Sequence, residues 1–469
     1  MKLIINTTLL TLLMSVCCIH SDVAAQDRSG SLIATEVSSL VNAEPEAAPA
    51  LFSETQLIDQ VEQQYETIST EYFDGSCTTC TSDNSCLTYL CIDQMFSGGW
   101  LDQGFTGNPN ASGGSNGPQG SNGPLIFNDQ ANEYMMNQLY LFAGRQVCED
   151  GCSWDLGGRV DLLYGTDYYF IQATGLETRD DNSQHWNSNT GPRNAGTAGL
   201  YGLALPQAYA EIYSPWAGGV NVKLGHFYTT MGYESVMAPE NFFYSHSYIM
   251  QYGEPFTHTG MLASWNSSSC LSWHAGITRG WNTWEQPNGQ SSFIGGVDWV
   301  SPGEETKLKF TVHTGNEDIT GNNNRTAYSL VFQQRLNQCW TYILHHNFGV
   351  EQNAKVNTSS QLDTAKWFGL VNYLYYTHNP CLDYGIRFEW FDDRDNARIF
   401  GLANDNIVTG GTYYNTTLGA NWHPNDWFVV RPEIRWDYSD LDAPGITGAF
   451  DGGTSRDQLT LGFDVLMTF

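Results

Sequence analysis

The connections between the alternating apolar segments of this chain fall into two lengths that follow one another in strict order. From residue 96 onward, tight turns such as Asn337-Gln338-Cys339 and Asn379-Pro380-Cys381 alternate with long polar connections such as 228–256 and 394–411. Short turns at one end and long loops at the other are what a transmembrane β-barrel requires. A soluble β-sandwich gives no reason for this sorting, so the pattern favours a barrel.

The segments between these connections are predicted to be strands that run in two directions. The expected upward strands are 98–106, 155–164, 220–227, 271–281, 306–313, 340–349, 382–393 and 428–438. The expected downward strands are 133–145, 205–213, 257–265, 292–300, 327–336, 366–378, 412–423 and 458–469. The sequence therefore predicts an all-β fold, a transmembrane antiparallel barrel of sixteen strands with short periplasmic turns and long extracellular loops.

Charged and apolar side chains alternate along several of these strands. On 428–438, for example, Ile434 and Trp436 face one way while Arg435 and Asp437 face the other. Burying such charges unpaired in a dry core would cost several kcal/mol each, whereas a wet lumen removes that cost. The predicted lumen wall contains Arg159, Asp161, Lys223, Lys307, Lys309, Arg335, Arg387, Glu389, Arg431, Glu433, Arg435 and Asp437.

The net charge restricts the partners. The chain has 20 Lys+Arg against 50 Asp+Glu, a formal charge of −30, which argues against nucleic acid because phosphate contacts need clustered cations. Since the predicted wall is nearly balanced, the negative excess is expected in the loops and the amino-terminal region. Acidic mouths concentrate cations, so a weak cation preference is predicted.

The amino-terminal residues have the features of an export signal. Residues 1–25 combine Lys2, an apolar run over 9–18 and the small-residue exit Val23-Ala24-Ala25, which predicts a secretory signal peptide. Cys17 and Cys18 raise the alternative of a lipoprotein, although the residues before them fit a lipid-attachment box poorly. The predicted location is the bacterial outer membrane, with its lipid and the barrel-assembly machinery as partners.

Residues 26–95 form a separate acidic region, expected to be periplasmic and partly disordered or helical. Its cysteines are Cys77, Cys80, Cys86 and Cys91. This spacing could bind zinc, but export and the absence of a nearby His favour disulfides. Further disulfide candidates near predicted short turns are Cys148 with Cys152 and Cys339 with Cys381.

The connection 228–256 is unusually aromatic and apolar for an exposed loop, which suggests that it packs inward. The residues expected to line a pore constriction there are Glu234, Glu240, Tyr244, His246 and Glu254. We hypothesise that the three glutamates face Arg387, Arg431 and Arg435 and create a transverse field that selects solutes. The alternative is a loop that packs over the rim of the barrel.

Catalytic and metal-binding signals are weak. No GxSxG, HExxH or P-loop spacing occurs, and the acidic run 392–396 lacks the glycine and distal Glu of an EF-hand. The prediction is therefore a protein that is not an enzyme and that has neither a cofactor nor a metal.

Three stretches of sequence resemble the OmpL-like family of β-barrel porins. They are the first strand with Gly98-Gly99-Trp100-Leu101-Asp102-Gln103-Gly104-Phe105-Thr106-Gly107-Asn108, the strand with Pro206-Gln207-Ala208-Tyr209, and Val222-Lys223-Leu224-Gly225-His226-Phe227 running into 239–260. The chain also ends on Phe469 after an alternating strand, which resembles the final strand of outer-membrane barrels that the assembly machinery reads.

This resemblance covers most of 96–469 and implies an outer-membrane porin. The predicted function is passive diffusion of ions and small polar solutes, and a homotrimer is one assembly that the protein could form. Three alternatives remain open: a non-conducting barrel that serves as a surface adhesin or structural anchor, an outer-membrane barrel hydrolase, and a secreted soluble β-protein.

Overall fold

The computed structural model describes most of the region after residue 93. The described residues are 94–111, 120–149, 153–179, 183–187, 199–285, 288–318, 321–355, 362–399, 410–441 and 447–469. The predicted signal peptide, residues 26–93 with their four cysteines, and Cys152 lie outside these ranges.

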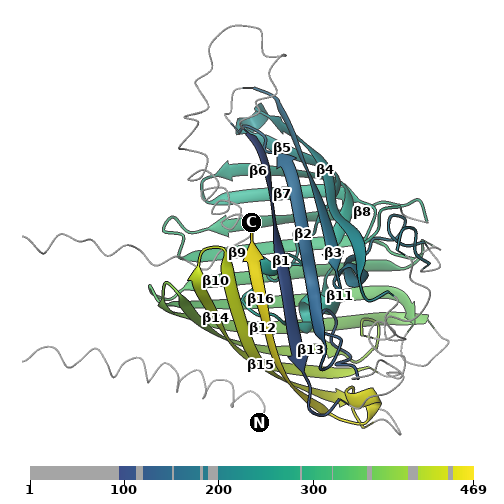
Figure 1. Cartoon of the computed structure of the whole chain (residues 1–469). Helices are drawn as coiled ribbons and strands as arrows, with labels where there is room; N and C mark the ends of the chain where they lie inside the picture. The colour runs from purple at the N-terminus through teal and green to yellow at the C-terminus, as the bar shows by residue number, and fades with distance from the viewer. Residues whose placement is uncertain are drawn as a thin grey trace, which may run out of the picture. The chain divides into compact units, whose positions relative to one another are not determined.

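The described residues form sixteen antiparallel strands that close into one barrel, each paired with its neighbours in sequence (Figure 1). The first eight are β1 (Met95–Gly107), β2 (Tyr134–Arg145), β3 (Asp155–Gly165), β4 (Gly202–Ser214), β5 (Val220–Tyr228), β6 (Thr257–Ser268), β7 (Leu271–Thr278) and β8 (Ser292–Val300). The other eight are β9 (Thr306–Asn316), β10 (Asn324–Arg335), β11 (Trp340–Lys355), β12 (Leu362–Asn379), β13 (Leu382–Asp393), β14 (Gly411–Asn425), β15 (Phe428–Leu441) and β16 (Asp457–Thr468). The predicted number of strands and their order are confirmed.

Helical elements in the described part of the chain are short. They are α3 (Tyr168–Ile171), η2 (Trp216–Gly218), η3 (Ala238–Glu240), the π-helical turn η4 (Ile249–Gly253) and η5 (Asp451–Gly453). None of the helices among the described residues has the length and hydropathy that crossing a bilayer demands.

The first and last strands close the barrel. In Figure 1, β1 at the purple end of the colour scale lies beside β16 at the yellow end. Their register runs from Trp100 opposite Thr468 to Gly107 opposite Leu461. One residue beyond the pair of Trp100 and Thr468, the amide of Phe469 donates to the carbonyl of Gly99 at 2.9 Å, and the amide of Gly99 donates to the carbonyl of Phe469 at 2.8 Å. The terminal Phe469 is therefore part of the seam.

Side chains along the strands alternate as the sequence predicts. On β15, Trp436 is 42% exposed on the outer surface, while Arg435 and Asp437 on the inner face are almost fully buried. The same contrast holds on β16 between Phe463 outside and Asp464 inside. The barrel is thus apolar toward its surroundings and charged toward its interior, which suits a lipid environment.

One strand, β7, ends three residues earlier than predicted. The alternation favours a strand over 271–281, but β7 ends at Thr278. Gly280 has a φ of +117°, a left-handed conformation that glycine adopts readily. The chain turns there, and Trp281 enters the barrel, where its indole Nε1 donates to Nδ1 of His313 at 2.9 Å.

The predicted disulfide between Cys339 and Cys381 is wrong, because both are free thiols. Cys339 lies between β10 and β11, and Cys381 lies between β12 and β13, so two strand spacings separate their turns. Strands are about 4.8 Å apart, which puts the two turns about 10 Å apart, whereas a disulfide needs Cα atoms within about 7 Å. Neighbouring turns on one rim are not close enough to be bridged.

Candidate functional site

The connection between β5 and β6, residues 229–256, folds into the barrel and is called the constriction loop here. Every residue over 241–256 is buried. The loop contacts inward-facing residues of β12 to β15, and its aromatic side chains belong to a hydrophobic core inside the barrel. This position inside the barrel explains the apolar composition of the loop. The loop does not pack over the rim of the barrel, which was the alternative.

Three arginines on the wall hold the backbone of the constriction loop. Arg387 of β13 and Arg431 and Arg435 of β15 each donate to carbonyl oxygens of the loop through their guanidinium groups. The N···O distances are 2.6 Å from Arg387 to Ser245, 2.8 and 2.6 Å from Arg431 to Ala238 and Asn241, and 2.6 Å from Arg435 to His246. These hydrogen bonds are charge-assisted and belong to the stronger class.

Two glutamates on the same wall accept hydrogen bonds from the loop. Glu389 of β13 accepts from the amides of Tyr248 and Ile249 at 2.7 and 2.8 Å, at the start of η4. Glu433 of β15 accepts from the amide of Ser245 at 3.2 Å. The wall thus satisfies both donors and acceptors of the buried loop backbone, which would otherwise be costly to bury.

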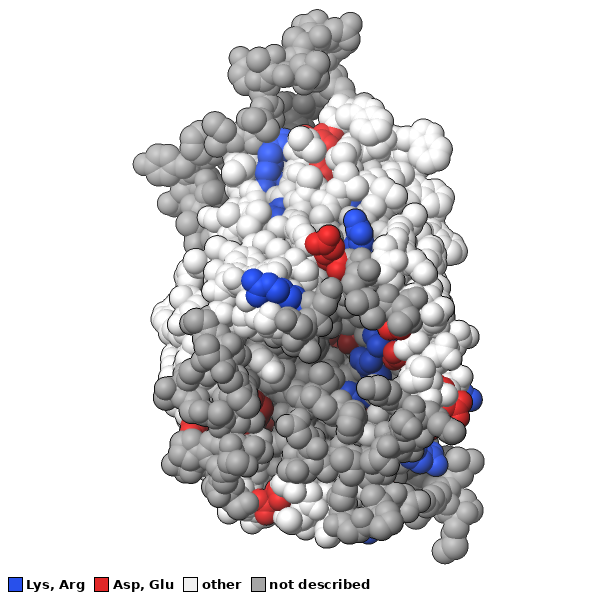
Figure 2. Space-filling model, turned by 90° about the vertical axis from the view of Figure 1, so that its right-hand side faces the viewer, with Lys and Arg blue, Asp and Glu red and all other residues white. Residues whose placement is uncertain are grey.

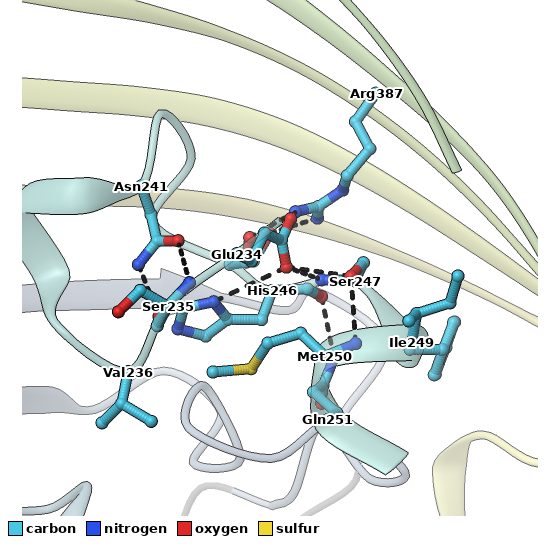
Figure 3. A network of polar contacts seen from close by, with 12 residues as sticks. Glu234, Ser235, Val236, Asn241, His246, Ser247, Ile249, Met250, Gln251 and Arg387 are labelled. Carbon is cyan, nitrogen blue, oxygen red and sulfur yellow. Dashed lines mark hydrogen bonds and ion pairs between the residues drawn. The ribbon is translucent and has the colours of Figure 1, made fainter. Parts of the chain in front are cut away.

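Glu234 is the centre of the contacts that fix the loop (Figure 3). Its Oε1 accepts from Nη1 of Arg387 and from the hydroxyl of Tyr373, both at 2.9 Å. Its Oε2 accepts from the amide and the hydroxyl of Ser247 at 2.7 and 2.9 Å, and Nδ1 of His246 lies 3.7 Å away. Burial alone would raise the pKa of Glu234, but Arg387, His246 and the Ser247 amide together hold that pKa well below its usual range.

The predicted pairing of loop glutamates with wall arginines is correct only for Glu234 and Arg387. Arg431 pairs with Asp464, and Arg435 pairs with Asp437 at 2.8 Å, so each is neutralised by its own wall. The remaining predicted residues of the loop lie as follows: Glu254 accepts from Nε2 of His345 at 3.0 Å and from Asn347 at 3.1 Å, Tyr244 donates to Asn137 at 2.9 Å, and Glu240 lies beside a cavity.

Glycines on the wall form sockets for the loop, which sequence reasoning missed. A Cβ atom at Gly104 of β1 would lie 2.6 Å from the ring of Tyr244, and one at Gly419 of β14 would lie 3.0 Å from Phe243. Cβ atoms at Gly385 and Gly369 would overlap Phe242 and Ile249 in the same way. Glycines at inward-facing positions, between larger inward side chains of the same strands, were the signal that could have located the docked loop.

Filling a socket is expected to displace the loop. In Gly385→Leu, the new side chain occupies the place of the Phe242 ring, and overpacking of this kind costs about 1–3 kcal/mol. We expect larger single-channel conductance and noisier open-channel current in planar bilayers. Ala275→Leu, at an exposed outward position of β7, is the matched control. Equal conductance and noise in Gly385→Leu and the wild type would contradict this role of the socket.

A second connection, between β1 and β2, also turns inward. The amide of Ile126 donates to Oε1 of Gln251 at 2.7 Å, and the hydroxyl of Tyr252 donates to the carbonyl of Pro124. Leu125, Ile126 and Phe127 join the same buried cluster as the constriction loop. Nothing in the sequence pattern distinguished this connection from the other long ones.

A cavity of about 470 Å³ remains beside the constriction loop. Tyr233, Val236 and Glu240 line it from the loop, and wall residues of β8 to β10 line it from the opposite direction. The charged and polar wall residues at the cavity are Asp298, Lys307, Lys309 and Gln333. Charges of both signs therefore border the space.

Four other predicted wall residues lie on β3, β5 and β10, and one of them, Arg159, also reaches the loop, with its Nη2 3.9 Å from Sδ of Met237. Arg159 and Asp161 form an ion pair at 2.7 Å on β3. Lys223 of β5 lies over the ring of Tyr209, 4.8 Å from its centroid, and Nη2 of Arg335 donates to the carbonyl of Gly303 at 3.2 Å. On the face shown in Figure 2, the described acidic and basic residues are interspersed, and some of both signs lie in a hollow near the centre.

Comparison with known proteins agrees with this architecture. The model of a protein family described as "Putative beta-barrel porin-2, OmpL-like" matches residues 96–469. No curated protein matches the sequence significantly. Among solved structures, OprB of Pseudomonas putida is 14% identical, with a TM-score of 0.50 over 80% of this chain and 94% of its own. An anion-selective porin from Comamonas acidovorans is 8% identical, with a TM-score of 0.50 over 80% of this chain and 99% of its own.

Proposed function

Since this chain belongs to the OmpL-like β-barrel porin-2 family and is an outer-membrane porin, we propose that it passes ions and small polar solutes by passive diffusion through the space beside the constriction loop. The observation that carries this proposal is the off-centre position of the loop. Its middle segment, residues 238–249, is held mainly by β13 and β15, whereas its two ends contact β9 to β11 and the cavity lies against β8 to β10. The bulk of the loop therefore lies on one side and leaves a narrowed passage on the other.

The lining of this space suits hydrated solutes. Lys307 and Lys309 border it from β9, and Glu240 borders it from the loop. Charged groups on both sides of a constriction replace part of the hydration of a passing ion and orient polar solutes. The family and the fold point to a channel rather than an enzyme, and they favour a porin over the adhesin or anchor.

Electrical recording of the refolded, detergent-purified protein tests the proposal. In a planar bilayer under a KCl gradient, we expect steady ohmic current steps and a measurable reversal potential. A barrel that is heat-modifiable on gels, and hence folded, but electrically silent would contradict passive diffusion and support the anchor or adhesin.

Three further predictions concern the two ends of the chain and its assembly. We propose that residues 1–25 are removed during export, that Phe469 is read by the barrel-assembly machinery, and that the protein assembles as a homotrimer. The mass of the mature protein and the amount of Phe469-deleted protein in the outer membrane test the first two. Light scattering in detergent tests the third.

A further inference from the structure

The cavity beside the constriction loop has an apolar side as well as a charged one. Met231, Val236, Met250 and Phe256 contribute apolar surface from the loop, and Val331 contributes it from β10. A cavity of about 470 Å³ lies within the range of small-molecule binding sites, which are mostly apolar with a few placed polar groups. The cavity therefore has the size and the mixed lining of a site that could bind a small molecule.

Several acidic groups at the cavity are already engaged. Glu234 is held by Arg387 and Ser247, and Glu254 is held by His345 and Asn347. Asp298 on β8 has an oxygen 3.7 Å from Nδ1 of His274. Glu240 and Glu304 also border the cavity, on the loop and at the turn before β9.

Lys309 is the cation left available to a solute. It lies on β9 at the cavity and is half-buried. Among the residues that the structure describes, it has no hydrogen-bond or ion-pair partner, although Asp298 is its neighbour across the β8–β9 pairing. A partly desolvated ammonium group with free donors gains most from a carboxylate.

We propose that this cavity binds small amphiphilic monoanions, with the carboxylate at Lys309 and the apolar body against Met231, Val236 and Phe256. The proposal rests on the proposed diffusion function and names the class of solute that the passage favours. It differs from the weak cation preference predicted from the net charge, because Lys309, and not the charge of the whole chain, contacts the carboxylate of the solute.

Competition between matched solutes tests the site. In bilayer recordings of the full protein in KCl, benzoate, benzylammonium and acetate are added at constant ionic strength, and the concentration that halves the current is measured. We expect benzoate to act at about tenfold lower concentration than the other two, because acetate lacks the apolar body and benzylammonium lacks the anion. Equal effects of benzoate and benzylammonium would overturn the proposal.

Substitutions at Lys309 test whether this residue causes the preference for benzoate. Lys309→Gln should remove the preference for benzoate, whereas Lys309→Arg should retain it. Lys366→Gln, at an exposed outward position of β12, changes the net charge by the same amount and should retain it too. Benzoate block that is unchanged in a heat-modifiable Lys309→Gln barrel would overturn the site. A conducting channel without block contradicts this inference alone, whereas a silent barrel contradicts the proposed function.

Discussion

Deletion of Pro239–Tyr248 is expected to raise the single-channel conductance severalfold. This segment contains the side chains that occupy the glycine sockets at Gly104, Gly385 and Gly419. It also contains most of the backbone that the wall arginines hold. Without it, water fills the space along β12 to β15, and the passage becomes wider. Conductance in planar bilayers is the measurement, and a value equal to that of the wild type would remove the constriction role.

The same deletion should also shift the reversal potential toward cations. Glu389 and Glu433 would lose loop amides that they accept from, whereas Arg387, Arg431 and Arg435 keep Glu234, Asp464 and Asp437, so the uncovered wall carries a negative excess that acts on passing ions. Replacement of the segment by Gly and Ser residues of equal length separates the bulk of the loop from its anchoring. A gain in conductance with the deletion but not with this replacement would show that length alone sets the constriction.

The second large effect is expected for Glu234→Gln. The change keeps the shape of the side chain but leaves Arg387, which is fully buried, without its anionic partner. Breaking a buried ion pair from one side costs about 3–5 kcal/mol. We expect this loss in the free energy of unfolding, measured by urea titration of the refolded protein. Burial of the Arg387 charge causes most of the loss.

A double-mutant cycle distinguishes this cause from a general loss of packing. Arg387→Met combined with Glu234→Gln should cost less than the sum of the two single changes, because the second change removes the unpaired charge. Additive losses would mean that the two side chains do not act as a pair. The cycle therefore measures their coupling directly.

The pair also determines how the loop responds to acid. Because Arg387 and His246 lower the pKa of Glu234, its stabilising contribution is complete above the ordinary glutamate pKa of about 4.3 and is lost only as the pH falls through the lowered value. The difference in conductance between the wild type and Glu234→Gln should therefore stay constant from pH 7 to about pH 4.5. A step in wild-type conductance within that window that is absent from Glu234→Gln would contradict the lowered pKa.

Much of the barrel could be predicted because apolar and polar side chains alternate along its strands, which shows the two faces of each strand in the sequence. The bounds of β13 and β8 match the predicted 382–393 and 292–300. β7 was predicted too long because Trp281 continues the alternation, while the conformation of Gly280 that ends the strand depends on the folded structure. Alternation indicates which face a side chain is on, and it does not show where the chain leaves the sheet.

The site was predictable only in part for a related reason. The composition of the constriction loop showed that it is buried, and the wall pattern showed that Arg387, Arg431 and Arg435 face inward. Their partners did not follow, because the arginines bind backbone carbonyls of the loop, which carry no sequence signature. The disulfide predicted between Cys339 and Cys381 was wrong for a similar reason. The sequence pattern places both turns at the same rim of the barrel, but it does not show how far apart the two turns are.

Two turns that carry exposed free thiols also make the orientation of the barrel open to direct chemical observation. Cys339 and Cys381 are exposed, and in each turn the amide of the cysteine donates to the side-chain oxygen of the asparagine two residues earlier, at 2.9 Å. A maleimide that cannot cross membranes would reach them in intact cells only if these turns face outward. Labelling that requires a permeabilised outer membrane would place them in the periplasm, without any engineered tag.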